Sequence, residues 1–287
     1  MAAVPAAAEG GRMTLVEHLR ELRNRVFKAA IGVVVATTLS WFFYDFFFSL
    51  LVEPYRTGVA NLSDRQLDEK LIQGTIAGPF ILQLKISALA GLVLSSPVWL
   101  YQLWAFIMPG LHRNERKWTL IFSAVAGPLF MAGVALGYFV LPKGIGMLLS
   151  FTEDEVGNYI EVSDYLSFTL RMLIAFGVAF EIPLFVILLN LAGVVSAAQL
   201  ASSRRWIVLL AFVFAAVATP SADPFSMLAL AIPMTLLFLA SELVAHLVDR
   251  RRLRKATEAG IGADQPSELD LSPDLEHDRR SSLPGPE

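Results

Sequence analysis

The chain has 287 residues, of which 55% are hydrophobic and 17% charged, and its mean hydropathy is +0.57. A soluble domain of this size has no core that could bury six apolar runs of about 20 residues, so we expect an all-α membrane protein. The sequence contains no cysteine, which excludes disulfides, thiolate metal sites and cysteine nucleophiles.

The N-terminal residues 1–13 are rich in alanine and lack the charged start and long apolar stretch of a secretory signal. We therefore expect a flexible N-terminus that is not cleaved. The next segment, 14–25, combines a capping-box pattern at Thr14 and Glu17 with a stripe of leucines. This pattern predicts an amphipathic helix at the membrane interface that continues into the first span.

Six apolar runs follow and predict six transmembrane helices within a domain of residues 14–255: 26–51, 86–107, 120–141, 166–191, 206–219 and 225–248. An even number of spans places both termini on one side of the membrane. Basic residues concentrate before the first run and after the second, fourth and sixth: Arg12, Arg20, Arg23, Arg25, Lys28, Arg113, Arg116, Lys117, Arg204, Arg205, Arg250, Arg251, Arg252, Arg254 and Lys255. The positive-inside rule therefore predicts that both termini are cytoplasmic.

The last two spans are predicted to be short. The fifth run has about 14 residues, which reach roughly 21 Å as a helix against a hydrocarbon core of roughly 30 Å, so it is expected to thin the bilayer. Pro233 interrupts the sixth run. The segment 256–287 is charged and rich in proline and serine, and it is expected to form a disordered cytoplasmic tail.

Two acids lie in or beside the apolar runs. Glu181 is near the middle of the fourth run, where an acid costs about 2.5 to 3.5 kcal/mol. It is either a hydrogen-bonded or protonated group that caps backbone freed by Pro183, or a polar contact for a partner helix or a proton. Asp223, in the turn before the sixth run, either caps the following helix or has a functional role.

Two further acids lie among basic residues on the predicted cytoplasmic side. Glu115 belongs to the basic segment 109–117, and Glu21 precedes Arg25 by four residues. Each is by itself typical of a solvated surface ion pair. Together, two carboxylates on one face can bind two neighbouring guanidinium groups through charge-assisted hydrogen bonds.

Motifs for catalysis are absent from the sequence. It has no phosphate-cradling glycine-rich loop with Lys and Ser or Thr, and its four histidines show no metal-binding spacing. We therefore expect no enzymatic activity, no cofactor, no metal and no nucleic-acid partner.

Several short motifs follow one another along the chain: His18–Arg25, Ser96–Phe106, Pro109–Leu111 with Asn114–Arg116, Phe180–Pro183 and Ala231–Met234. In order and spacing they resemble the TatC family, the core subunit of the twin-arginine protein translocase. The resemblance implies a six-helix, glove-like protein of the bacterial cytoplasmic membrane. It also implies that the protein binds twin-arginine signal peptides of folded proteins at its cytoplasmic face, and that it assembles with the single-span partners TatA and TatB using the proton-motive force.

The resemblance also assigns roles to individual residues. The acids that recognise the arginine pair match Glu115 and Glu21, and positions lining that region match Phe106 and Gln102, with Arg23 and Arg25 as the cytoplasmic basic pair. Structural positions of the first external region match Pro54 and Phe80, and the intramembrane acid matches Glu181.

The turn before the sixth run departs from the family pattern. It reads Thr-Pro-Ser-Ala-Asp, so Asp223 follows a turn one residue longer than the family's, and Met227 stands where many relatives have glutamine. A partner helix is therefore expected to rely on apolar packing, Thr219 or Ser226.

Two other functions remain as alternatives. A proton-coupled small-solute transporter would use Glu181 and Asp223, but the sequence shows no internal repeat of the kind that such transporters contain. A passive membrane scaffold would leave protein export intact when deleted. Association into homo-oligomers is left open.

Overall fold

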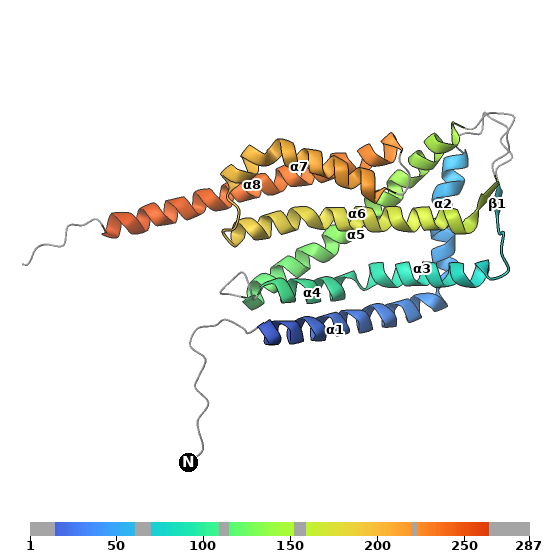
Figure 1. Ribbon diagram of the computed structural model, residues 1–287, viewed down its shortest axis with the longest axis horizontal. Helices are drawn as coiled ribbons and strands as arrows, with labels where there is room; N and C mark the ends of the chain where they lie inside the picture. Colours follow the sequence, from blue (N-terminus) through green and yellow to red (C-terminus); the bar gives the residue numbers. More distant parts are fainter. Residues whose placement is uncertain (1–14, 61–69, 109–114, 152–158, 220–222, 264–287) are drawn as a thin grey trace, which may run out of the picture.

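The computed structural model describes residues 15–60, 70–108, 115–151, 159–219 and 223–263 (Figure 1). In chain order its elements are α1 (Leu15–Phe42), α2 (Tyr44–Ala60), β1 (Lys70–Ile72), α3 (Gly78–Leu94), α4 (Ser96–Ile107), α5 (Glu115–Leu149), β2 (Tyr159–Glu161), α6 (Val162–Leu191), α7 (Ala197–Ala218) and α8 (Pro224–Ala263). Within these residues, five single helices are long and apolar enough to cross a membrane. The pair α3 and α4, bent by 56°, provides a sixth candidate span.

The long helices lie side by side, while α5 crosses them diagonally and α2 runs across the bundle (Figure 1). We call the end where α1 and α7 begin and α4 and α6 finish the basic end, because exposed arginines such as Arg20, Arg23 and Arg205 lie there, and Arg250 lies where α8 leaves the bundle. We call the opposite end, which carries β1 and β2, the sheet end.

A two-stranded parallel sheet at the sheet end was not predicted from the sequence. Lys70 pairs with Tyr159, Leu71 with Ile160 and Ile72 with Glu161. Each strand has three residues, too few to show the alternation that marks a strand in a sequence. The pairing brings the beginnings of α3 and α6 together, which positions two polar side chains discussed below.

Two of the predicted spans are divided in the structure. The apolar run 26–51 is shared between α1 and α2, which are separated at Phe43. The run 86–107 bends at Ser95, and Pro97 occupies the first turn of α4, where its missing N–H has no helical partner to lose.

The last two helices extend beyond their apolar runs. A capping box between Ser196 and Gln199 starts α7 ahead of Trp206, so the helix has 22 residues and is about 33 Å long although its apolar part is short. The helix α8 continues to Ala263, through residues 256–263 of the segment expected to be disordered. Good helix formers such as Ala256 and Glu258 favour this continuation.

Close helix contacts in the bundle depend on glycine. A Cβ at Gly91 of α3 would lie 2.5 Å from the Cα of Thr37 on α1, and one at Gly133 of α5 would lie 2.5 Å from the carbonyl oxygen of Phe176 on α6. Small residues of this kind let helix backbones approach in membranes. The most buried helix is α6, whose Leu166, Met172 and Phe176 have no exposed surface.

Candidate functional site

A cleft of about 240 Å³ lies between α1 and α4 toward the basic end. Its lining residues are Leu22, Arg25, Val26 and Ala29 from α1, and Trp99, Gln102, Leu103 and Phe106 from α4. The ring of His18 stacks on that of Phe106, with centroids 4.4 Å apart and 21° between the planes. The structure thus brings three of the predicted binding residues, Arg25, Gln102 and Phe106, into one cleft.

Glu21 binds a guanidinium group within its own helix. Arg25 donates to Glu21 Oε1 from Nε at 2.8 Å and from Nη2 at 2.6 Å. The second oxygen, Oε2, is buried and has no hydrogen-bond partner among the described residues. Arg23 is exposed and takes no part in this pair. Glu21 therefore holds a guanidinium on one oxygen and keeps an acceptor on the other.

Glu115 is the first residue of α5 and lies at the basic end, next to the α4 helix that lines the cleft (Figure 1). The indole of Trp104 on α4 packs on Phe122 of α5, with ring centroids 5.1 Å apart, and so fixes the two helices together. The side chain of Glu115 and residues 109–114 lie outside the described part of the chain.

A second group of predicted residues lies where α7 ends and α8 begins. Asp223 Oδ1 accepts a hydrogen bond from the backbone N–H of Ser226 at 2.6 Å, which is the geometry of a helix N-cap. Thr219 donates to the carbonyl of Ala215 at 2.8 Å, and Met227 packs against the core, half-buried. Of the two interpretations of Asp223, capping has a direct structural basis.

Glu181 lies on another helix, α6. It is nineteen residues along α6 from Val162, which corresponds to about 28 Å from the beginning of the helix near the sheet end. Its side chain is 5% exposed, and neither carboxylate oxygen has a hydrogen-bond partner among the described residues. The carboxyl group therefore caps none of the described backbone groups near Pro183.

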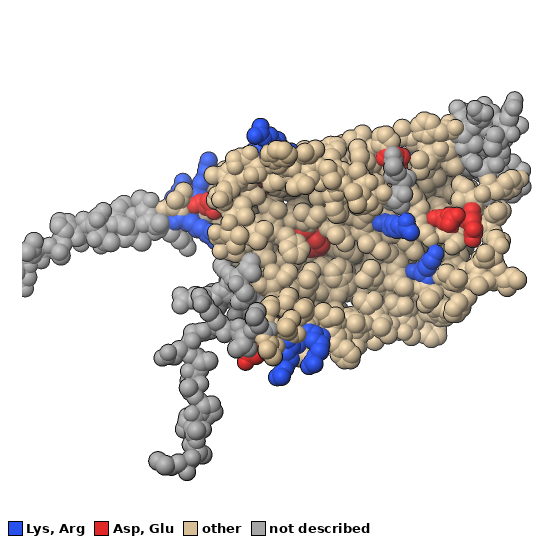
Figure 2. Space-filling view, viewed as in Figure 1, with Lys and Arg blue, Asp and Glu red and all other residues tan. Residues whose placement is uncertain are grey.

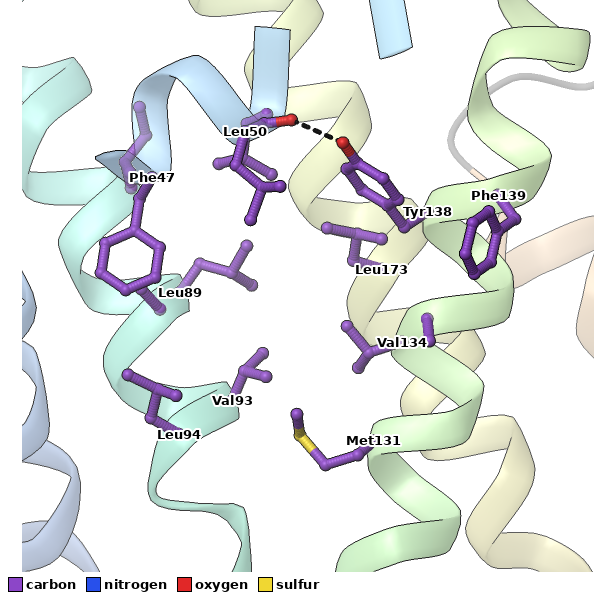
Figure 3. Close-up of a pocket in the computed structure, with 14 residues that line it drawn as sticks. Phe47, Leu50, Leu89, Val93, Leu94, Met131, Val134, Tyr138, Phe139 and Leu173 are labelled. Atoms are coloured by element: carbon purple, nitrogen blue, oxygen red, sulfur yellow. Dashed lines mark hydrogen bonds between the residues drawn. The ribbon is translucent and has the colours of Figure 1, made fainter. Parts of the chain in front are cut away.

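Pro54 lies inside α2 and removes the N–H that would bind the carbonyl of Leu50. The hydroxyl of Tyr138 on α5 donates to that carbonyl at 3.0 Å (Figure 3), and Tyr165 on α6 donates to the next one, Leu51, at 2.7 Å. Pro54 thus creates an attachment point for α5 on α2.

Phe80 lies near the start of α3, where it is exposed and meets Trp41 of α1 edge-on at 6.0 Å. Both predicted external positions, Pro54 and Phe80, contact neighbouring helices at or near the sheet end.

A larger cavity of about 330 Å³ lies beside Tyr138, between α2, α3, α5 and α6 (Figure 3). Its lining is apolar, with Phe47, Leu89, Met131 and Leu173 among the residues that form it, and no acidic or basic side chain contributes to it. Such a lining suits a hydrocarbon chain.

The sequence interpretation missed an ion pair between α7 and α8. Arg204 donates to both oxygens of Glu242, from Nε at 3.0 Å and from Nη2 at 2.6 Å. Glu242 is 3% exposed, and His246 Nε2 lies 3.7 Å from the same carboxylate. The available signal was an acid inside the sixth apolar run, as unusual in composition as Glu181.

A second set of polar contacts ties α8 to the turn between α6 and α7. Asp249 accepts hydrogen bonds from the N–H of Ala197 at 2.7 Å and from Asn190 Nδ2 at 3.1 Å. Arg252 donates to the carbonyls of Asn190 and Leu191. No group of three or more metal-ligating side chains occurs within the described residues.

Residues 17–233 match the family model described as Sec-independent protein translocase protein (TatC). The chain belongs to the TatC family. The TatC protein of Frankia casuarinae is 44% identical to it over 92% of this chain and 74% of that protein. The TatC protein of Xylanimonas cellulosilytica is 39% identical over 89% and 91% of the respective chains.

Two solved structures of the twin-arginine translocase receptor TatC, one of them in the detergent DDM, are similar to this chain. Both are 34% identical and cover 80% of it and 99% of the solved chain, with TM-scores of 0.68 and 0.69. These matches confirm the resemblance to TatC and the all-α membrane fold inferred from the sequence. As a TatC protein, the chain is a multi-pass membrane component of a Sec-independent protein translocase, a transport family without enzymatic activity.

Proposed function

We propose that the chain binds twin-arginine signal peptides of folded export proteins at the basic end, through Glu21 and Glu115. The solved relatives are described as twin-arginine translocase receptors, which supports a receptor role for this chain. The basic end then faces the cytoplasm of a bacterial cell, with both termini on that side of the cytoplasmic membrane, in agreement with the exposed arginines that gather there (Figure 2).

The observation that carries the proposal is the guanidinium already bound to Glu21. Arg25 forms two charge-assisted hydrogen bonds to Oε1, which shows that this carboxylate accepts a guanidinium group. A peptide arginine that replaces Arg25 meets the same acceptor, together with the unpaired Oε2. The adjacent cleft, lined by Gln102 and Phe106, offers contacts for the residues that follow the arginines. Glu115 supplies the second carboxylate for the second arginine.

After recognition, the protein assembles with TatA and TatB and uses the proton-motive force to move folded proteins. Glu181 provides a polar contact for a partner helix, because a buried carboxyl group without a hydrogen-bond partner gains stability from any donor that reaches it. Thr219 and Met227 form a separate partner contact where α7 ends and α8 begins, and Asp223 holds the start of α8 in place.

A direct binding measurement tests the receptor role. The purified chain in lipid nanodiscs is titrated with a fluorescent twin-arginine signal peptide, and anisotropy reports association. The E21Q/E115Q variant is expected to lose binding. The matched control, D45N/E53Q, removes two exposed acids from α2 and is expected to bind normally.

A second arm replaces the two arginines of the peptide by lysines, which keeps the charge but removes the planar fork. We expect weaker association of the lysine peptide with the unmodified chain. Equal binding of both peptides, or full binding by E21Q/E115Q, contradicts the proposed site.

A further inference from the structure

Two basic side chains lie on the apolar helices α3 and α6, closer to the sheet end than to the basic end. Lys85 is half-buried on α3, and its Nζ lies 3.0 Å from Ser167 Oγ on α6. Arg171 is exposed on α6, one helical turn beyond Ser167, so the two α6 side chains share a face. Figure 2 shows basic side chains over α6 and α3 in this region.

The fold accounts for this juxtaposition. The parallel pairing of Ile72 with Glu161 holds the beginnings of α3 and α6 together, and both helices run from the sheet end toward the basic end. The Lys85–Ser167 contact therefore joins residues 82 positions apart in the sequence. Ser167 in turn donates to the carbonyl of Ser163 at 2.6 Å, which leaves its oxygen oriented as an acceptor toward Lys85.

Neither cation has a carboxylate partner among the described residues. The acids of this end, Glu161 and Asp164, lie nearer the beginning of α6 than Arg171 does. Cations on spanning helices are costly unless they pair with an anion or reach the headgroup region. Arg171 lies about 13 Å along α6 and Lys85 about 10 Å along α3, depths from which long basic side chains reach toward lipid phosphates.

We propose that Lys85 and Arg171 bind the phosphate of a phospholipid from the leaflet at the sheet end. The guanidinium fork of Arg171 and the ammonium of Lys85 complement a phosphate diester, and the ammonium keeps its hydrogen bond to Ser167. The surface deeper in the membrane is apolar and open: Ala88 follows Lys85 by one turn, and Val178 follows Arg171 by two turns and is 43% exposed. The acyl chains of the same lipid lie along this surface.

The bound lipid lies over α3 and α6, on the face where Figure 2 shows basic side chains. The lipid is therefore a structural ligand that joins α3 and α6. This inference does not depend on recognition of a signal peptide.

Photolabelling with a phospholipid tests the proposal. The full chain is reconstituted into dioleoylphosphatidylcholine vesicles that contain a phosphatidylglycerol with a diazirine in one acyl chain. After irradiation, mass spectrometry of peptides locates the label. Labelling is expected on the segments around Ala88 and Val178, and it is expected to be lost from both segments in K85Q/R171Q.

Two variants separate the proposal from a general effect of charge or of misfolding. The R56Q/K143Q variant removes two exposed cations of α2 and α5 and is expected to label as the unmodified chain does. The K85R/R171K variant keeps both charges and is expected to retain the label. R171Q changes only an exposed side chain and is expected to reduce labelling while the protein stays folded.

Unchanged labelling of both segments in K85Q/R171Q overturns the proposal. Displacement of the labelled lipid by inorganic phosphate at millimolar concentration also overturns it, because a site that holds a lipid by its phosphate and its chains is not emptied by the free anion alone.

Discussion

The hydroxyl of Tyr138 donates a hydrogen bond to the carbonyl of Leu50, which lacks its helical donor because Pro54 stands four residues later. Proline in α2 and tyrosine in α5 therefore act as a pair. A donor on one helix replaces the N–H that the other helix lost, and Tyr165 adds a similar bond to the neighbouring carbonyl of Leu51. Helix breakers in membrane helices are tolerated when neighbours satisfy the freed groups.

Because of this pairing, the loss of unfolding free energy on removing the Tyr138 hydroxyl should depend on whether residue 54 is proline. In the unmodified chain, Y138F is expected to lower the free energy of unfolding by about 1 kcal/mol, since the Leu50 carbonyl loses its donor. In a P54A background the alanine N–H binds that carbonyl, and Y138F is expected to cost much less. A double-mutant cycle from unfolding in sodium dodecyl sulfate measures the coupling. Equal costs in the two backgrounds contradict the pairing.

The ion pair between Arg204 and Glu242 should respond asymmetrically to substitution. R204Q leaves the carboxylate of Glu242 buried without its main partner, so it is expected to lower the melting temperature in detergent. R204Q/E242Q removes the uncompensated charge as well and is expected to recover much of that loss. The control is R205Q, an exposed neighbour. A double variant as unstable as R204Q argues against a charge-pair origin of the effect.

Asp223 should contribute to stability through its cap at the start of α8. D223A is expected to lower the free energy of unfolding by about 0.5 to 2 kcal/mol, whereas D223S and D223N retain a capping oxygen and are expected to cost little. The same unfolding titration provides the comparison. If export of a twin-arginine precursor fails in D223N although the protein is stable, Asp223 has a role besides capping.

The contact of α1 with α3 should not tolerate a methyl group at Gly91. G91A places a Cβ 2.5 Å from the Cα of Thr37, and the overpacking is expected to cost about 1 to 3 kcal/mol. G127A is a matched control in another helix, because the nearest atom to its Cβ is 3.7 Å away, at Pro97. We expect a lower yield of folded protein, measured by size-exclusion chromatography in detergent, for G91A only.

Arg25 should compete with the signal peptide for Glu21. Under the proposed function, R25Q frees Oε1 of Glu21 and is expected to strengthen association of the twin-arginine peptide. R23Q removes a neighbouring exposed charge that makes no contact with Glu21, so it controls for the change in net charge. Peptide anisotropy in nanodiscs measures both variants. Weaker binding by R25Q than by R23Q indicates that Arg25 assists the peptide and does not compete with it.

The sequence predicted the class of fold because the apolar runs are long and the basic residues are unevenly distributed. It did not predict that the helix breaks at Phe43 and that α2 continues in another direction. The residues on both sides of the break are apolar, so hydropathy does not distinguish two helices from one. The sequence also did not predict the sheet, since the pairing of Lys70 with Tyr159 depends on chain ends brought together by helices.

The candidate site divides in the same way. Gln102 and Phe106 were identified from motifs within α4, and the structure places them in one cleft with α1. Contacts between distant segments had no local signal in the sequence, as for Arg204 and Glu242, which are 38 positions apart. The sequence also could not exclude that Glu181 caps backbone groups; the structure shows that its carboxylate binds none of the described ones. Local motifs identify candidate residues, whereas tertiary packing determines which of these residues are in contact.

Parallel strands cannot be joined by a tight turn, and here α3, α4 and α5 lie between Ile72 and Tyr159. During biosynthesis, α3 and α4 cross the membrane in one direction and α5 in the other after β1 has been made. Only then is β2 synthesised, and only then can it pair with β1. When translation reaches Tyr159, every residue that lines the α1–α4 cleft has already been synthesised. At that point β1 has no strand to pair with. The residues that line the α1–α4 cleft are therefore synthesised before β2, whose pairing with β1 holds the beginnings of α3 and α6 together.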